Sequence, residues 1–254
     1  MKKILYYLSC CILLFAGYSC STDIDNYDEP QETLKGEVID KNTMKPMQTE
    51  VSDAGIRLKL MEYSWSDNPT PYYFYCKQDG TFNNTKIFKG TYNVVPQGAF
   101  VPLVQKDDEG NTILDESRTL EIKGSVDLKF EVEPFLNIEW IGEPVVNSNG
   151  SITIQVKVTR GTTNTKYQQN VSDIVLFINS SSPYVGDNNY DNRYITKLSG
   201  DDANSALGKT ITLTTTGEFS KARTYYVRVG ARIDYNVEGS KRYNYNEPKT
   251  VPIP

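Results

Sequence analysis

The chain has 254 residues, 27 basic and 32 acidic, so its formal net charge at pH 7 is −5. This acidic balance argues against nucleic-acid binding, because phosphate contacts from a net-positive face dominate that affinity. The absence of histidine from the sequence excludes Ser-His-Asp and Cys-His nucleophilic catalysis and removes the commonest zinc ligand. Carboxylate-pair chemistry needs only Asp or Glu and stays open.

The N-terminus predicts a secretory signal. Lys2 and Lys3 precede an apolar run from Ile4 to Phe15, which is too short to span a bilayer, and small residues then lead to Cys20. This order resembles a bacterial lipoprotein signal, in which the cysteine becomes the first residue of the mature chain and carries lipid. We expect removal of residues 1–19 and acylation of Cys20. The alternative is an ordinary secreted protein cleaved nearby.

Residues 20–30 form an acidic stretch without apolar periodicity, which is typical of a disordered tether. Acidic residues soon after a lipidated cysteine resemble the surface-export signal of some gut Gram-negative bacteria. The resemblance implies a lipid-anchored outer-membrane protein that faces the cell exterior. A solvated tether of any compartment would have a similar composition. Cleavage takes away two lysines and no acid, so 25 basic and 32 acidic residues remain, a net charge of −7.

Only two of the four cysteines, Cys20 and Cys76, remain after cleavage. Acylation of Cys20 leaves Cys76 without a disulfide partner, so the folded domains must depend on their cores. No histidine can activate the Cys76 thiol, and Phe74 lies on the same strand face. We therefore expect Cys76 to be an inert core residue. No cofactor is expected.

After the signal, no stretch sustains the apolar spacing of an amphipathic helix, and short alternating runs bounded by turn residues predict an all-β protein. Pro134 ends one of these runs, which gives two predicted β-sandwich domains, residues 31–133 and residues 134–254. The expected strands are Thr33–Ile39, Gly55–Tyr63, Tyr72–Lys77, Gly90–Val95, Arg118–Ile122, Ser125–Val132, Leu136–Gly142, Ser151–Thr159, Asp173–Asn179, Tyr194–Leu198, Lys209–Thr215, Thr224–Asp234 and Asn246–Pro252.

Four short motifs follow one another in the first domain. Asp79-Gly80 supplies the positive φ that a tight hairpin needs, and Phe82 is expected to fill the core just after it. The order of the motifs resembles the transthyretin-like fold of carboxypeptidase regulatory domains, which says little about function because one fold hosts many activities. The motifs are G-x-V-x-D at residues 36–40, T-x-x-P at 43–46, D-G-x-F at 79–82 and G-x-Y at 90–92.

The second domain contains the segment TYYVRVGARI at residues 224–233, which resembles the penultimate strand of a fibronectin type III or immunoglobulin (Ig)-like sandwich. Tyr226, Arg228 and Gly230 alternate with a more apolar set, so the strand is expected to have one buried and one wetter face. The last strand, Glu247–Pro252, is expected to pair beside it. No disulfide or core-tryptophan spacing adds to this pattern.

The signal, the tether and the two domains together resemble a family of unknown function. Its members are lipoproteins encoded beside the outer-membrane glycan importers and lipid-anchored lids of polysaccharide-utilisation systems. The resemblance implies a non-catalytic surface protein near glycan uptake. Its expected partners are the outer-membrane lipid, a glycan and the importer complex. The family offers no site residues that transfer to this chain.

Fifteen tyrosines remain after cleavage, and the first segment that gathers them runs from Tyr63 to Tyr75. A polar loop places Trp65 near its tip, and period-2 alternation puts Tyr73 and Tyr75 on one strand face. Aromatic rings beside a loop suit stacking against sugar rings, so we expect these three side chains to bind glycan. The alternative is that the tyrosines are cross-strand packing and Trp65 caps the core.

The second segment, Pro183–Tyr194, has too few apolar residues to be core. Asn, Asp and Tyr are residues that hydrogen-bond to and stack on polyols. We therefore expect this loop to contact glycan, and the alternative is a merely solvated loop. The expected contacts are Tyr184, Asn189, Tyr190 and Tyr194.

The same loop is a weak calcium candidate. Asp187, Asn189 and Asp191 match positions 1, 3 and 5 of a calcium-binding loop. Asn192 stands where such a loop has its glycine, and Leu198 stands where it has its bidentate glutamate. A helix–loop–helix context is also missing, so we expect no metal.

The third segment, residues 234–246, predicts a hairpin that turns through Glu238-Gly239-Ser240. In an Ig-like fold this hairpin would connect the last two strands, a position used for recognition. Tyr235, Tyr243 and Tyr245 alternate onto one side, and we expect Tyr243 and Tyr245 to contact glycan. An exposed hairpin stiffened by tyrosine pairs is the alternative.

The sequence therefore favours a non-catalytic cell-surface lipoprotein that binds glycan or serves as an accessory component of an outer-membrane glycan-uptake system. The alternative is a purely structural subunit that docks on an importer without binding sugar. A carboxylate-based hydrolase is a third hypothesis. Retaining glycosidases need two carboxylates about 5–5.5 Å apart, and nothing in the sequence singles out such a pair.

Overall fold

The computed structural model describes residues 28–219 and 222–253. The predicted signal peptide, Cys20 and most of the predicted tether lie outside the described residues. The chain divides into two units, residues 1–30 and residues 31–254, and both β-sandwiches belong to the second unit. No helix among the described residues is long and apolar enough to cross a membrane.

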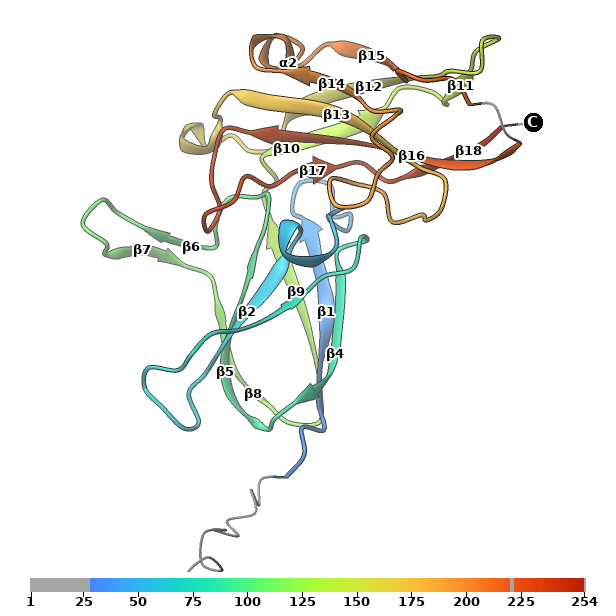
Figure 1. Ribbon diagram of the computed structural model, residues 1–254. Helices are drawn as coiled ribbons and strands as arrows, with labels where there is room; N and C mark the ends of the chain where they lie inside the picture. Colours follow the sequence, from blue (N-terminus) through green and yellow to red (C-terminus); the bar gives the residue numbers. More distant parts are fainter. Residues whose placement is uncertain (1–27, 220–221, 254) are drawn as a thin grey trace, which may run out of the picture. The chain divides into compact units, whose positions relative to one another are not determined.

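The first sandwich is built from a three-stranded and a four-stranded sheet (Figure 1). In the smaller sheet, β1 (Glu32–Asp40) lies between β4 (Thr81–Ile87) and β9 (Ser125–Val132), antiparallel to β4 and parallel to β9. The larger sheet has the order β3-β2-β5-β8. Its strands are β2 (Arg57–Glu62), β3 (Tyr72–Tyr75), β5 (Gly90–Gln97) and β8 (Arg118–Ile122).

Period-2 alternation turns one face of each sheet inward. Leu58 and Leu60 on β2 and Val94 on β5 are fully buried between the sheets. Cys76 joins this core at 3% exposure, and burial raises the pKa of its thiol far above its usual range, so the prediction of a core cysteine is confirmed.

The predicted turn at Asp79-Gly80 is present but does not close a hairpin between paired strands. Gly80 has φ of 76°, and Phe82 just after it is 2% exposed, as predicted. However, β3 belongs to the larger sheet and β4 to the smaller one, so the turn carries the chain from one layer to the other. The prediction missed β4 itself because its sequence, TFNNTKI, contains only two large apolar residues.

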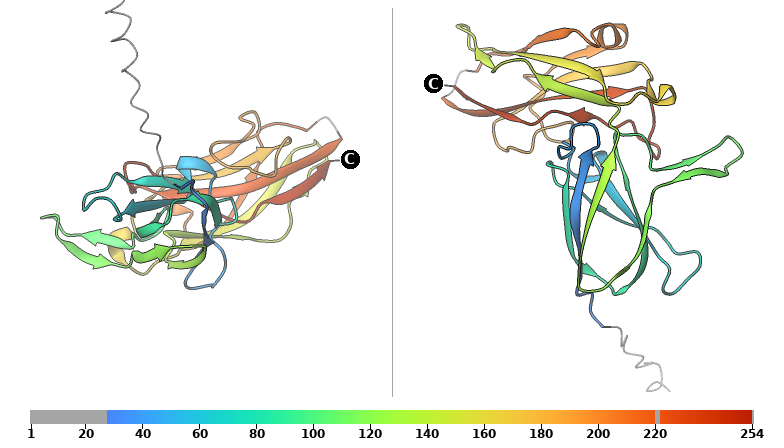
Figure 2. Two further views of the ribbon diagram at one scale, coloured as in Figure 1. Left: turned by 90° about the horizontal axis from the view of Figure 1, so that it is seen from below. Right: turned by 180° about the vertical axis from the view of Figure 1, so that it is seen from behind.

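A separate two-stranded hairpin lies between β5 and β8. Its strands, β6 (Val104–Lys106) and β7 (Thr112–Asp115), pair only with each other, and the hairpin stands away from the sandwich (Figure 1 and Figure 2). Every residue of β7 is exposed. The sequence analysis predicted neither strand.

The second sandwich also has two sheets. In one, β12 (Ile152–Arg160) pairs with β10 (Leu136–Trp140), β11 (Val145–Val146) and β15 (Thr210–Thr214). In the other, β13 (Val171–Asn179) lies between β14 (Thr196–Ser199) and β16 (Arg223–Ile233). The two last strands, β17 (Asn244–Tyr245) and β18 (Lys249–Ile253), both pair with β16.

The fold is therefore all-β with two β-sandwiches, as predicted, and the last strand lies beside the strand of residues 224–233, as predicted. Short helical segments lie between strands. They are η2 (Ser52–Ala54), η3 (Thr165–Tyr167) and α2 (Asp201–Ser205). Ala203 of α2 and Tyr167 of η3 are buried in the core of the second sandwich.

The outer face of β16 is buried, which corrects the prediction of a wetter face. Arg228 is 0% exposed, and its guanidinium lies over the ring of Tyr245 with 4.2 Å between Cζ and the ring centroid. It donates to the carbonyl oxygens of Thr49, Val185 and Asn246. Burial lowers the pKa of Arg228 to about 10. Strand alternation does not reveal that a second layer of chain covers this face.

The two sandwiches share a hydrogen-bonded joint in which most of the interacting groups are buried. Arg242 donates to the carbonyls of Asp53 and Gly55, and the Asn244 carboxamide donates to the Ala99 carbonyl at 2.7 Å. The Tyr245 hydroxyl donates to the buried Glu50 carboxylate at 3.2 Å. Because buried polar groups are costly when unpaired, these contacts hold the two sandwiches together.

Candidate functional site

A groove of about 650 Å³ lies where the first sandwich, its β6–β7 hairpin and loops of the second sandwich meet. Ligand sites in proteins are commonly concave and of about 300–1,000 Å³. The lining comes from parts of the chain that are far apart in sequence, between Lys59 and Glu238. This groove is the candidate functional site.

The floor of the groove is the outer face of β2 and β5. In the antiparallel register, Lys59 lies opposite Val95 and Met61 opposite Asn93, and all four line the groove. Lys59 and Met61 alternate along β2 with the buried Leu58 and Leu60, so they point outward because of the same pleat that turns the leucines into the core. Tyr63 continues this row just beyond β2 and is 44% exposed.

Two walls rise from the floor. The β6–β7 hairpin contributes Gln105 and Lys106 on one side. The second sandwich contributes Lys166 in η3 and the loop of residues 235–238. Tyr235 in that loop is held in place by ring contacts with Phe135 and Tyr167, at centroid distances of 5.6 and 5.2 Å.

Amide side chains in the groove are oriented by their neighbours. The Asn93 amide nitrogen donates to Ser117 Oγ at 2.6 Å and to Thr119 Oγ1 at 3.0 Å. The Gln97 carbonyl oxygen accepts from Arg57 Nε at 2.8 Å, which turns its NH₂ group away from the arginine. Asn93 is thereby left with its carbonyl oxygen as an acceptor and Gln97 with its NH₂ group as a donor, and hydroxyl groups of a ligand can pair with both.

Two carboxylates line the groove, Asp115 and Glu238. Asp115 accepts from the backbone N–H of Ser117 and from its hydroxyl, and these hydrogen bonds lower the pKa of Asp115. A group that protonates a leaving group at neutral pH needs a raised pKa instead. The chemistry of the lining therefore suits binding through rings, amides and ammonium groups.

Apart from Tyr63, the first predicted segment lies outside this lining. Trp65 is 68% exposed, and its indole N–H donates to Glu62 Oε1 at 2.8 Å. Tyr73 and Tyr75 share the outer face of edge strand β3, as the alternation predicted. Tyr75 is 45% exposed, whereas Tyr73 lies half-buried beneath the guanidinium of Arg57 at 4.5 Å. Trp65 therefore does not cap the core.

The second predicted segment packs on its own sandwich and also bonds to the first one, so that many of its polar groups are already paired. Tyr184 is 52% exposed, but Tyr190 packs on Phe177 with 5.4 Å between ring centroids. Tyr194 is half-buried against Phe219, with 4.3 Å between the centroids. The side-chain oxygen of Asn189 accepts from Asn179 at 2.8 Å. These contacts leave Tyr184 as the most exposed ring among the predicted contacts of this loop.

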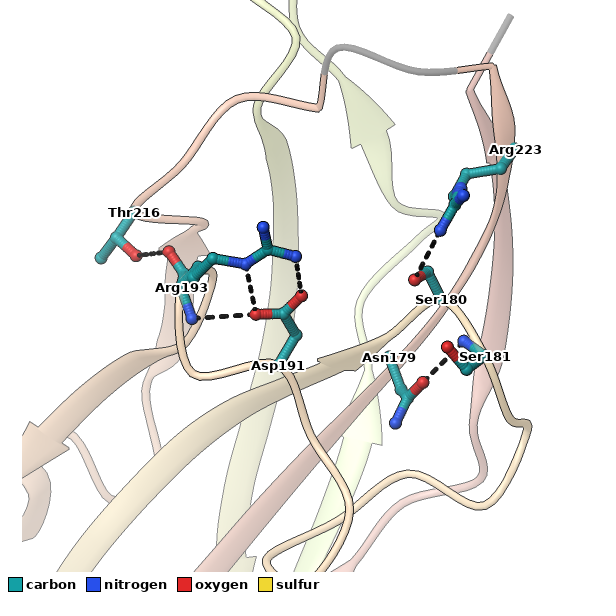
Figure 3. A network of polar contacts seen from close by, with 7 residues as sticks. All are labelled: Asn179, Ser180, Ser181, Asp191, Arg193, Thr216 and Arg223. Carbon is teal, nitrogen blue, oxygen red and sulfur yellow. Dashed lines mark hydrogen bonds and ion pairs between the residues drawn. The ribbon is translucent and has the colours of Figure 1, made fainter.

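The three residues proposed as a weak calcium candidate do not offer a common set of free oxygens. The backbone N–H of Asp187 donates to the hydroxyl oxygen of Tyr245 at 3.1 Å. The carboxylate of Asp191 pairs with the guanidinium of Arg193 through two bonds of 2.6 and 2.9 Å, within the polar network drawn in Figure 3. No group of three acidic, cysteine or histidine residues that could hold a metal occurs within residues 28–219 and 222–253.

The third predicted segment contains the clearest correction. Tyr243 and Tyr245 are 6% and 7% exposed, so neither ring offers a face to a glycan. They pack with Phe177 over Gly230, where a Cβ would lie 2.8–3.1 Å from all three rings. The predicted hairpin itself is present, because β16 and β17 pair antiparallel and Val237 and Ser240 bridge across the turn at Glu238-Gly239.

A family model described as the N-terminal domain of a protein of unknown function (DUF3823) matches residues 32–133. The crystal structure of a DUF3823 family protein from Bacteroides uniformis is 41% identical, with a TM-score of 0.82. The match covers 89% of this chain and 100% of that chain. This chain belongs to the DUF3823 family.

Two more distant solved structures share the fold. A "putative carbohydrate binding protein" from Bacteroides uniformis is 21% identical, with a TM-score of 0.67, and the match covers 88% of this chain and 100% of that chain. A DUF3823 family protein from Parabacteroides merdae is 20% identical, with a TM-score of 0.62 and the same coverage. No curated protein matches the chain.

The predicted membership of a family of unknown function is thus confirmed, and the DUF3823 match bears directly on the groove. The matched residues 32–133 supply its floor and the hairpin wall. The second sandwich supplies the opposite wall, and the 41% identical DUF3823 protein spans both. The complete groove therefore needs both domains of the DUF3823 fold.

None of the residues that line the groove was predicted to contact glycan, although Tyr63 and residues 235–238 lay within segments singled out for other side chains. One signal was available, because Lys59 and Met61 alternate with buried leucines and so had to face outward. Nothing in the sequence tells which outward face a second domain will enclose.

Proposed function

We propose that this protein is a non-catalytic, cell-surface lipoprotein that binds a glycan in the groove between its two sandwiches and serves an outer-membrane glycan-uptake system. The observation that carries the proposal is the lining of the groove, in which exposed Tyr63 and ring-supported Tyr235 accompany oriented amides. Flat rings with polar edges suit the apolar faces of sugars, and amides suit their hydroxyls. The name of the B. uniformis structure, at 21% identity, supports the same class of ligand.

The proposal of a non-catalytic role is supported by the groove's carboxylates. Asp115 lies beside the hairpin and is held by Ser117, whereas Glu238 lies in the opposite wall at the positive-φ turn. Glycoside hydrolysis needs one carboxylic acid with a raised pKa beside a second carboxylate. The hydrogen bonds to Asp115 act in the opposite direction, because they lower its pKa.

The cellular localisation in the proposal is inferred from the sequence. The order of charged start, apolar run and Cys20 supports lipidation, and the acidic residues that follow support display on the outer surface. A protein held there would present its groove to glycans outside the cell. Protease treatment of intact cells tests this address, because a surface protein is cut and a protein facing the periplasm is protected.

Titration calorimetry with a panel of plant and mucin oligosaccharides tests the binding function. We expect Tyr63→Ala to weaken binding by about tenfold, because it removes an exposed ring from the lining of the groove. Tyr75→Ala is the matched control, because Tyr75 is equally exposed on the same sandwich but does not line the groove. Trp65→Ala tests the loop predicted from the sequence. Loss of binding in Trp65→Ala with Tyr63→Ala unchanged would move the site to the loop.

A second candidate function, docking on an importer without binding sugar, is supported by the β6–β7 hairpin. This isolated hairpin exposes Ile113 at 62% and Leu114 at 38%, and two-stranded hairpins are only marginally stable alone in water. Copurification of the tagged protein from membranes with an outer-membrane importer, lost in Ile113→Asp, would favour docking. Absence of binding to every glycan in the panel, together with that copurification, would replace the first proposal by the second.

A further inference from the structure

Three lysines surround the groove, each from a different element. Lys59 rises from strand β2 in the floor, Lys106 ends strand β6 of the hairpin, and Lys166 lies in η3 of the second sandwich. Lys59 is half-buried, whereas the other two are exposed. Residues separated by more than a hundred positions thus bring three ammonium groups to one concave site.

None of these ammonium groups is neutralised within the part of the chain that the structure describes. The ion pairs of residues 28–219 and 222–253 involve other lysines and arginines. Lys166 Nζ lies 5.8 Å from the centroid of the Tyr167 ring. The three side chains therefore keep their positive charge available to a ligand.

The two carboxylates of the groove interact with residues other than the three lysines. Asp115 accepts two hydrogen bonds from Ser117. Glu238 lies close enough to Arg242 for its charge to raise the pKa of that guanidinium, although burial lowers this pKa overall. Among the ion pairs of residues 28–219 and 222–253, none joins either carboxylate to a groove lysine. Three lysines and two carboxylates give the lining a net charge of +1, whereas the chain as a whole has a net charge of −5.

We propose that the groove selects an anionic glycan, one whose sugar rings carry carboxylate or sulfate groups. This inference rests on the proposed function, since it names the class of sugar that the same groove takes. Like charges gathered around a concave site repel one another, and an anion in the site relieves that repulsion. The rings and amides serve the neutral parts of the sugar, and the ammonium groups meet its charge from the floor and both walls.

The two sources of negative charge are distinguished by their probes. Oligogalacturonides carry carboxylates, chondroitin sulfate oligosaccharides carry sulfates as well as carboxylates, and neutral β-galactan oligosaccharides of the same length carry neither. We expect at least one of the anionic probes to bind about tenfold more tightly than the neutral one in calorimetry at low salt. Its affinity falls as sodium chloride is raised from 50 to 500 mM, because salt screens exposed charges.

The triple variant Lys59→Gln, Lys106→Gln and Lys166→Gln tests which lysines are responsible. Its matched control is Lys89→Gln, Lys123→Gln and Lys209→Gln, which removes the same charge at exposed lysines outside the groove. The groove variant is expected to lose the preference for the anionic probe and most of the salt dependence. The control variant is expected to keep both, and thermal melting of each variant checks that it is folded.

The outcomes separate this inference from the function on which it rests. Equal or tighter binding of the neutral galactan, abolished by Tyr63→Ala, overturns the anionic preference while glycan binding stands. Anionic binding that both triple variants weaken equally places the effect in overall charge and also overturns the inference. Absence of binding to every probe contradicts the inference and the proposed function together.

Discussion

Two outer sheet faces of this protein carry tyrosines, and one of these faces is buried whereas the other is exposed. On the second sandwich, the outer face of β13 and β16 is covered, and Tyr243 and Tyr245 are buried in a small core with Val175, Phe177 and Val185. On the first sandwich, the outer face of β2 and β5 is left open as the floor of the groove, with Tyr63 at its edge. Tyrosine content alone therefore does not identify a binding face.

What covers one face is the loop of residues 180–190 together with the first sandwich. Val185 of this loop is fully buried over the aromatic cluster. Asn188 donates to the carbonyl of Val51 and to the hydroxyl of Ser52, which fastens the loop to the first sandwich. The loop that the sequence suggested as a recognition loop therefore acts mainly as a cover for the joint.

The largest expected effect is the loss of stability on substitution of Arg228, which lies on the covered face. Arg228→Ala leaves the carbonyls of Thr49, Val185 and Asn246 without their donor and opens a cavity over Tyr245. We expect a loss of about 3–5 kcal/mol in the free energy of unfolding, measured by urea denaturation. Arg223→Ala on the same strand is the control, because the exposed Arg223 side chain donates to Ser180 Oγ, and it should cost less than about 1 kcal/mol. Equal losses of stability in Arg228→Ala and Arg223→Ala would contradict the burial of Arg228 in the joint.

A smaller effect is expected from one hydroxyl of the covered cluster. Tyr245→Phe removes the group that donates to Glu50 and accepts from the N–H of Asp187, while it keeps the ring. Leaving a buried carboxylate with one donor fewer should cost about 2 kcal/mol in the same denaturation experiment. The matched change on the open sandwich, Tyr75→Phe, should leave stability within about 0.5 kcal/mol of the parent.

On the open face, we expect a substitution to weaken glycan binding while it leaves the stability of the fold nearly unchanged. Tyr63→Ala should change the free energy of unfolding by less than about 0.5 kcal/mol, because 44% of the side chain is exposed. The same variant should lose about tenfold in glycan affinity. A strongly destabilised Tyr63→Ala would show that this face, too, is structural.

The smallest effect concerns the edge of the covered face, where Asp173 lies between Lys197 and Arg232. Burial alone would raise the pKa of Asp173, but hydrogen bonds and ion pairs from these two cations outweigh burial and lower it. A carboxyl whose pKa is lower in the folded state stabilises the fold above its unfolded pKa of about 3.9, and this stability is lost as the pH falls further.

Asp173→Asn should therefore cost about 1 kcal/mol at pH 7 and progressively less as the pH falls below 4. Thermal melting across pH 2.5 to 7 measures this dependence. The control is Asp127→Asn, because the carboxylate of Asp127 is 70% exposed and only 3.9 Å from its lysine partner. A constant difference between Asp173→Asn and the parent at every pH would contradict the assigned pKa direction.

Much of the fold could be predicted because it depends on local alternation. The strands of residues 57–62, 118–122 and 125–132 follow from apolar residues at every second position, and Gly80 and Phe82 follow from the chemistry of a turn. Strand β4 could not be found in this way, since it is mostly polar and finds its register by pairing with β1. The two-residue strands β11 and β17 are too short to carry a period.

The candidate site was harder to predict because it is made by long-range contacts. Lys59, Lys106 and Lys166 come together only after the hairpin and the second sandwich have folded around the floor. Arg228 looked like a solvent-facing residue because its neighbours alternate correctly, and only the joint makes it buried. Local sequence predicts which face of a strand a side chain is on, but the packing of the neighbouring domain determines whether that face is exposed to solvent.

Oxidative footprinting of the protein with and without a bound oligosaccharide tests the contrast between the two faces most directly. We predict that Tyr243 and Tyr245 resist hydroxyl radicals in both states, since they are buried. Tyr63 should react in the free protein and be protected by the oligosaccharide, while Trp65 should react in both states. Protection of Trp65 with Tyr63 unchanged, or strong labelling of Tyr245 in the free protein, would contradict the account.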